Sequence, residues 1–176
     1  MGCCVRALDL TRADSEPVRF AERLSLPLPG GEEVVSSLAP VEFAGLLTRS
    51  ERGYLLEGEV RGEATLRCGR CLGEFPFHFS ECLELKLLAL AAAPRDDETR
   101  LGREDLEVRF FDGPELDLAE LAGEQFQLAL PVKPLCSPTC RGLCPRCGSN
   151  LNEAGCGCPQ EKDERWTPLL DWRPSR

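Results

Sequence analysis

Residues 56–67 read LEGEVRGEATLR, and Cys68-Gly-Arg-Cys71 follows them at once. Apolar or small residues occupy the even positions of this stretch, and polar residues, most of them charged, occupy the odd ones. Because the side chains of a strand alternate between its two faces, twelve residues with this period predict a half-buried antiparallel strand. The glycines on the apolar side indicate that something packs closely against that face.

A second alternating stretch follows the two cysteines. Its apolar members share one face, which only Glu81 interrupts; they are Phe75, Phe77, Phe79, Leu83, Leu85 and Leu87. Two alternating stretches joined by a short connection predict a long β-hairpin. The turn of this hairpin then carries Cys68 and Cys71.

Shorter elements are expected around the hairpin. Strands are predicted over residues 3–8, 41–48 and 107–111, and the charged stretch 94–104 is predicted to be an exposed loop. Asp117 is predicted to cap a helix that ends near Leu128, because the apolar residues after Asp117 recur at helical spacing. Asp163 is predicted to cap a second, short helix. The fold class expected is α+β, with an antiparallel β-rich body, a long hairpin and one or two helices.

The charge of the chain divides it into two parts. Residues 1–130 hold 14 basic and 25 acidic residues, whereas residues 131–176 hold 7 basic and 5 acidic ones. Six of the eleven cysteines lie in the second part, where the aliphatic periodicity stops. We therefore predict an acidic β-rich body over 1–130 and a small cysteine-rich, zinc-binding tail over 131–176.

Composition excludes several classes of protein. A net charge of −9 disfavours general binding to nucleic acid or anionic membranes, and no apolar run approaches the ~20 residues that span a bilayer. The start of the chain lacks the features of a secretory signal, so a reducing, cytoplasmic compartment is expected, in which clustered cysteines bind metals rather than form disulfides. The single histidine, His78, excludes most catalytic zinc sites. No nucleotide-binding or hydrolase motif is present, and neither an enzymatic activity nor a small-molecule substrate is expected.

The strongest metal motif lies at 144–158. Cys144 and Cys147 form a CxxC followed by a glycine, and Cys156 and Cys158 follow eight residues later. Four thiolates at this spacing predict a structural zinc site, although spacing alone does not distinguish zinc from an iron–sulfur cluster.

Two further pairs remain, Cys68 with Cys71 and Cys136 with Cys140. Together they would form a second zinc site that joins the root of the tail to the hairpin turn. The alternative is a site within the tail, in which Cys136 or Cys140 joins Cys144 and Cys147. Cys3, Cys4 and Cys82 have no partner spacing and are expected to be ordinary thiols, and His78 is expected on the surface.

The tail resembles a known family. The motifs that carry the resemblance are LALPVKPLC at 128–136, CRGLCPRCGSNLN at 140–152, Cys156-Gly-Cys158 and Asp163-Glu-Arg-Trp166, together with the CGRCL turn at 68–72. Over roughly residues 40–172 this pattern is similar to the YceD family, the large ribosomal RNA subunit accumulation proteins. Asp163-Glu164-Arg165 departs from the Asp-Pro-Arg that is common in the family.

The resemblance implies a non-enzymatic factor that supports large-subunit ribosomal RNA accumulation. Any contact with RNA is expected through the basic tail, where Lys133, Arg141 and Arg146 lie in a stretch without acidic residues; Arg165 and Trp166 are weaker candidates. The alternative is a zinc-ribbon adaptor that binds a ribosomal protein or an assembly factor without touching RNA. The acidic body would suit such a basic partner.

Overall fold

The computed structural model describes residues 7–28, 34–93, 102 and 107–159. The elements in chain order are β1 (Ala7–Asp9), η1 (Leu10–Asp14), β2 (Val18–Leu24), β3 (Val35–Leu38), β4 (Val41–Ser50), β5 (Gly53–Arg67), β6 (Glu74–Ala89), η2 (Leu90–Ala92), β7 (Val108–Phe111), β8 (Glu115–Asp117) and α1 (Leu118–Ala129). The protein is thus β-rich, with a single α-helix among the described residues.

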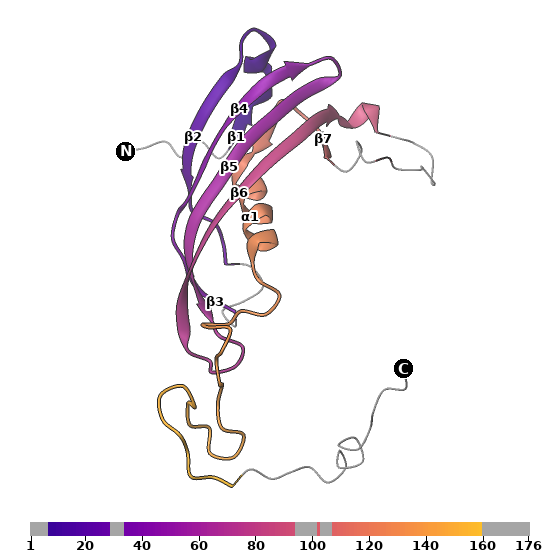
Figure 1. The fold of residues 1–176 in the computed structure, drawn as a ribbon. Coiled ribbons are helices and arrows are strands. Elements are labelled where there is room, and N and C mark those ends of the chain that lie inside the picture. The colour runs from indigo at the N-terminus through magenta and orange to yellow at the C-terminus, as the bar shows by residue number, and fades with distance from the viewer. Residues whose placement is uncertain (1–6, 29–33, 94–101, 103–106, 160–176) are drawn as a thin grey trace, which may run out of the picture.

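The long hairpin is confirmed. β5 and β6 pair antiparallel without interruption from Gly53↔Leu88 to Arg67↔Glu74, and residues 68–73 form the turn between them. The even positions of β5 lie toward the core and the odd positions toward solvent, as the alternation predicts. Figure 1 shows the hairpin as two long curved strands that reach from one end of the sheet to the other.

The sheet has the strand order β2-β4-β5-β6-β7, and β3 pairs with β5 next to β4. The expected antiparallel β-rich body is confirmed for every strand pair but one: β7 pairs parallel to β6, with Val108 beside Lys86. A parallel neighbour needs a connection of about a dozen residues or more, and residues 90–107 supply that length. Whether β7 runs parallel or antiparallel to β6 depends on this connection and not on the local pattern of apolar residues.

Glycines on the inner face of β5 make room for aromatic rings. A Cβ atom at Gly58 would lie 2.9 Å from the Phe43 ring, and one at Gly62 would lie 2.7 Å from the Phe79 ring. Phe43 is fully buried and packs edge-on against Phe20. The close packing expected from the small residues is therefore present.

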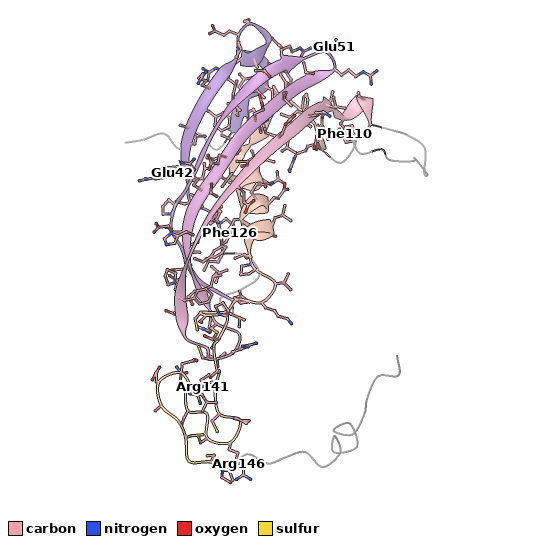
Figure 2. All side chains as sticks on the ribbon, viewed as in Figure 1. Glu42, Glu51, Phe110, Phe126, Arg141 and Arg146 are labelled. Carbon is pink, nitrogen blue, oxygen red and sulfur yellow. The ribbon has the colours of Figure 1, made fainter. Side chains whose placement is uncertain are left out.

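The helix α1 covers the inner face of the sheet. Leu118, Leu121 and Phe126 are buried, and the centroid of the Phe126 ring lies 5.0 Å from that of the Phe79 ring of β6. Figure 1 shows α1 against one face of the curved sheet, and Figure 2 shows Phe126 between the helix and the strands. The predicted cap is confirmed, because Asp117 Oδ1 accepts hydrogen bonds from the backbone N–H groups of Ala119 and Glu120.

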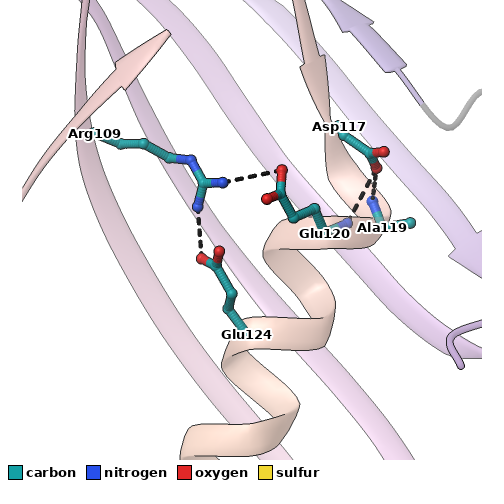
Figure 3. A network of polar contacts seen from close by, with 5 residues as sticks. All are labelled: Arg109, Asp117, Ala119, Glu120 and Glu124. Atoms are coloured by element: carbon teal, nitrogen blue, oxygen red, sulfur yellow. Dashed lines mark hydrogen bonds and ion pairs between the residues drawn. The ribbon is translucent and has the colours of Figure 1, made fainter. Parts of the chain in front are cut away.

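An ion-pair network joins α1 to the short strand β7. Arg109 on β7 lies 2.6 Å from Glu124 and 3.1 Å from Glu120, which are one helical turn apart on α1 (Figure 3). The Arg109 side chain is 25% exposed, so this pair of contacts is partly shielded from solvent. The network holds the helix above the end of the sheet where the parallel strand joins it.

The strands β2, β3 and β8 were not expected from the sequence. The predicted strand at 41–48 is confirmed and extends to Ser50, and the strand at 107–111 is confirmed as β7. Ala7 and Leu8 of the strand predicted at 3–8 lie in β1, which pairs with β8. Three predicted segments lie outside the described residues: the start of the first strand (3–6), the loop at 94–104 except residue 102, and the helix after Asp163. The α1 helix ends at Ala129, and the division into a body of 1–130 and a tail of 131–176 stays a prediction.

Replacing Gly62 by Ala is expected to destabilise the protein by about 1–3 kcal/mol, because the new methyl group overlaps the Phe79 ring and Val41. Gly123→Ala is the matched control: its position in α1 has no neighbour within 4 Å, so this change is expected to stabilise by about 0.5–1 kcal/mol. Denaturant titration followed by circular dichroism measures both changes. Equal effects of the two substitutions would contradict the packing described for β5.

Candidate metal centres

The turn of the hairpin holds Cys68 and Cys71 in fixed positions. The backbone N–H of Cys68 donates to Gly73 O at 2.9 Å, and that of Leu72 donates to Cys68 O at 3.0 Å. Leu72 has a φ of 60°, a left-handed conformation that closes the turn tightly. The N–H of Gly69 donates to Pro134 O at 2.8 Å, so the chain leaving α1 runs directly past the turn.

This contact brings two distant cysteine pairs together. Four thiols gather here, and we call them the hairpin set: Cys68, Cys71, Cys136 and Cys140. Their sulfur atoms all lie within 4.8 Å of one another, and three of the four side chains are buried. The structure thus groups Cys136 and Cys140 with the hairpin turn rather than with Cys144 and Cys147.

The sulfur separations fit a tetrahedral thiolate site. Cys68 Sγ lies 3.8 Å from Cys140 Sγ, and Cys71 Sγ lies 3.7 Å from Cys136 Sγ. A disulfide would need about 2.05 Å, whereas zinc held by four sulfurs at about 2.3 Å places them about 3.8 Å apart. The donor set and its spacing therefore match a structural zinc site.

Hydrogen bonds to the sulfurs favour the thiolate form at part of this set. Burial opposes the ionisation of Cys68, but hydrogen bonds from backbone amides, including that of Arg70, outweigh it and lower the pKa of Cys68 to about 6. The side chains of Cys71 and Cys140 raise the pKa of Cys136 to about 12. Four like charges cannot accumulate here without a cation, and a divalent metal would supply the missing positive charge.

A second group of thiols lies farther along the tail. We call it the tail set: Cys144, Cys147, Cys156 and Cys158, whose sulfur atoms also lie within 4.8 Å of one another. The N–H of Gly148 donates to Cys144 O at 2.9 Å, and Gly148 has a φ of 72°, which favours glycine. The Ser149 hydroxyl, 3.2 Å from Cys147 Sγ, lowers the pKa of Cys147 to about 6, and Cys147 in turn raises that of Cys158 to about 12.

The tail set is attached to the hairpin turn through Arg70. Its backbone carbonyl accepts from the N–H of Leu143 at 3.2 Å, and its guanidinium donates to Cys140 O at 2.9 Å. Gly142, at a φ of 76°, lets the chain pass so close that an added Cβ atom would lie 3.1 Å from Arg70 O. The segment that carries the tail set therefore packs against the same turn that carries Cys68 and Cys71.

Asn152 lies in the segment between Cys147 and Cys156 of the tail set and bonds to a member of the hairpin set. Its Nδ2 donates to Cys140 Sγ at 3.3 Å, and its Oδ1 accepts from the N–H of Arg141 at 2.7 Å. The hydrogen bond from Asn152 is the main reason that the pKa of Cys140 is lowered. Outer hydrogen bonds of this kind orient metal ligands and stabilise their thiolate form.

Sequence reasoning identified the eight cysteines but not Arg70 or Asn152. Arg70 lies inside the CGRC turn, and Asn152 ends the SNLN run after the second CxxC, so both stood within motifs that were noticed. Their roles depend on contacts between segments far apart in sequence, which no local pattern indicates. His78 is exposed, as expected, and its Nδ1 lies 3.2 Å from Glu63 on β5; Cys82, for which either a core or a surface position was open, is exposed.

The basic candidates for RNA contact are exposed where the structure describes them, namely Lys133, Arg141 and Arg146. In Figure 2, Arg141 lies near the hairpin turn and Arg146 at the end of the described part of the tail that is farther from the sheet. Arg165, Trp166, Cys3 and Cys4 lie outside the described residues. Within the described part of the chain, no helix has the length and apolar character needed to cross a membrane.

A family model covers most of the hairpin and both cysteine sets. The model for the large ribosomal RNA subunit accumulation protein YceD matches residues 56–171. The chain belongs to the YceD family. The resemblance inferred from the CGRC turn and the tail motifs is therefore confirmed, and the matched region begins within β5.

Relatives of this YceD-family chain come from bacteria and plants. An uncharacterized protein of Mycobacterium tuberculosis is 31% identical over 68% of this chain and 55% of its own length. The chloroplastic YCED homolog 1 of Arabidopsis thaliana is 26% identical over 76% of this chain and 49% of its own. The maize protein of the same name is 26% identical over 88% of this chain and 62% of its own. The chain thus spans about half to three fifths of these relatives, and no solved structure matches it.

Replacing Gly142 by Ala is expected to detach the tail set from the hairpin turn, at a cost of about 1–3 kcal/mol, because Ala strains the left-handed backbone and approaches Arg70 O. Limited proteolysis should then cleave within residues 143–159 faster, while the melting temperature of the body stays unchanged. Gly155→Ala, at a position with no neighbour within 4 Å, is the control. Unchanged cleavage of the Gly142 variant would contradict the docking described here.

Proposed function

We propose that this protein is a non-enzymatic factor that supports the accumulation of large-subunit ribosomal RNA, and that two structural zinc ions hold its tail in place. One observation carries the proposal: the YceD family model covers residues 56–171, the segment that contains all but the first three residues of the hairpin and all eight clustered cysteines. The plant relatives, which are named large ribosomal RNA subunit accumulation proteins, support the same function.

A structural role for the zinc follows from the number of ligands. Each set offers four sulfur ligands, and four thiolates complete the tetrahedron around zinc. No coordination position is then left for the water or substrate that a catalytic zinc ion needs. We therefore propose no enzymatic activity, and a reducing, cytoplasmic environment in which the thiols stay available for metal.

RNA would meet the tail rather than the body. Arg141 and Arg146 are exposed and lie in a stretch free of acidic residues. Arg141 precedes the CxxC of the tail set, and Arg146 lies within it. Zinc in the two sets would hold both side chains on a fixed backbone. The planar guanidinium of arginine suits phosphate oxygens, and the acidic body would keep the RNA backbone away from the sheet.

Freshly purified protein is expected to contain two zinc ions per chain by elemental analysis. Cys147→Ser should reduce this to one and unfold the segment around the tail set while the body and the hairpin set stay folded, because structural zinc contributes on the order of 10 kcal/mol to local folding. Cys82→Ser, which changes an exposed cysteine outside both sets, should keep two ions. Protein without stoichiometric metal would contradict the zinc proposal, and a brown sample containing iron and sulfide would replace zinc with an iron–sulfur cluster.

The RNA contact is tested by the double change Arg141→Glu and Arg146→Glu. Binding to a large-subunit ribosomal RNA fragment should weaken at least about tenfold, and the dependence of log K on log salt should lose about two units of slope, with zinc content unchanged. Arg19→Glu with Arg23→Glu makes the same charge change on exposed residues of β2 and should have little effect. Equal binding by the tail variant and the parent would favour the alternative, an adaptor that contacts a ribosomal or assembly protein.

A further inference from the structure

The strand β6 has a free edge along most of its length. β7 pairs only with residues 86–89 of β6, and no other described strand or backbone group pairs with residues 74–85 on that side. Figure 1 shows β6 along the border of the sheet, with β7 at one end only. An open edge of this length is unusual, because its unpaired backbone groups can pair with another chain.

The register shows which backbone groups point outward. The Cys68 N–H donates to Gly73 O, so residues 68 and 73 form a hydrogen-bonded pair. Along an antiparallel ladder, hydrogen-bonded pairs alternate with pairs that lack these bonds. The odd-numbered residues of β6 therefore form their backbone hydrogen bonds with β5. The even residues must point their N–H and C=O groups away from β5, and Lys86 does so, because its N–H donates to Glu107 O at 2.8 Å. The outward set between the turn and β7 is Glu74, Pro76, His78, Ser80, Cys82 and Glu84.

Pro76 limits how far another strand can extend. It has no N–H, and its outward position is the place in a sheet where proline is tolerated. Beyond it, four successive outward residues, from His78 to Glu84, each offer one donor and one acceptor. All four side chains are exposed, so nothing among the described residues covers this stretch.

The charge beside this edge favours a basic partner. Glu57 and Glu84 lie directly opposite each other on β5 and β6 in a pair without backbone hydrogen bonds, where the side chains approach most closely. Both are exposed, and neither has an ion pair within the described part of the chain. Like charges in this position destabilise a sheet, and a lysine or arginine opposite Glu84 on an added strand would offset that repulsion.

The other face of the same edge is apolar except at Glu81, which lies between Phe79 and Leu83. Phe77 and Leu85 point inward from β6 and are only half-buried, whereas Phe79 and Leu83 between them are buried. A strand paired with β6 would place alternate side chains over Phe77 and Leu85. The edge therefore fits a segment in which basic and apolar residues alternate. A second copy of this chain fits poorly, because each copy carries a net charge of −9.

We propose that the free edge of β6, from His78 to Glu84, binds an extended segment of a basic protein by strand addition. Backbone hydrogen bonds would supply most of the affinity, and the alternation of basic and apolar side chains would supply the specificity. The inference does not rest on the proposed function, since it concerns the acidic body and makes no use of zinc or of the tail. It names the class of partner that the body accepts.

The test uses the full zinc-loaded chain and a blocked peptide of about eight residues that alternates Lys and Val. Amide exchange followed by NMR should slow at His78, Ser80, Cys82 and Glu84 when the peptide is added, whereas the odd-numbered amides between them are already protected by β5. The same peptide, N-methylated at the alternate residues whose N–H groups would face β6, keeps its charge but cannot donate hydrogen bonds to this edge. It should bind at least about tenfold more weakly.

Two protein variants separate strand addition from general attraction of charge. Ser80→Pro removes one outward donor and should weaken binding at least about tenfold relative to Ser80→Ala. The double variant Glu57→Lys with Glu84→Lys should weaken peptide binding by a similar factor. The control, Glu16→Lys with Glu51→Lys, changes the net charge equally at exposed positions away from this edge and should leave peptide binding unchanged. The charge variants keep the test valid if Ser80→Pro fails to fold. Slowed exchange at other amides, or equal binding of the N-methylated peptide, would overturn the proposal.

Discussion

Each residue of β5 pairs with a residue of β6, and this uninterrupted pairing places the Cys68–Cys71 turn at the end of the sheet. A shift of one residue would turn every buried side chain of one strand toward solvent, including the fully buried Leu56, Val60 and Leu66. The packing of α1 on the inner face therefore fixes the register, since Phe126 needs Phe79 beneath it. Because the register is fixed, the position of the two turn cysteines is fixed as well, before any contact with the tail is made.

The tail depends on that turn because it has almost no core of its own. Apart from Leu135 and Leu143, which are half-buried against the hairpin set, the described part of the tail packs mostly through thiols, glycines and polar turns. Small units of this kind usually need a metal to fold. The segment that carries the tail set is held to this turn by the bond from the Leu143 N–H to Arg70 O and by the bond from Asn152 to Cys140 Sγ, so the position of the tail set relative to the sheet follows from the hairpin set.

The elements with a strong local pattern could be predicted from the sequence. The period of two in β5 and β6 and the Asp117 cap each reflect side-chain placement within one segment. Two of the three missed strands were short: β3 has four residues, two of them serines, and β8 has three, whereas β2 has seven. The parallel direction of β7 and the contacts of Asn152 depend on distant parts of the chain, which periodicity does not encode. The cysteine spacing suggested two sets but also allowed a site within the tail. The contact of Gly69 with Pro134, which spacing does not indicate, brings residues 136–140 to the turn and groups Cys136 and Cys140 with Cys68 and Cys71.

In the assembly proposed here, one metal ion joins the hairpin turn to the root of the tail. Substituting ¹¹³Cd for zinc and correlating the cadmium resonances with cysteine Hβ protons by NMR would identify the ligands of each ion. Two cadmium resonances are expected, one of which couples to Cys68, Cys71, Cys136 and Cys140, and the other to Cys144, Cys147, Cys156 and Cys158. A resonance coupled to Cys136 or Cys140 together with Cys144 and Cys147 would contradict this arrangement.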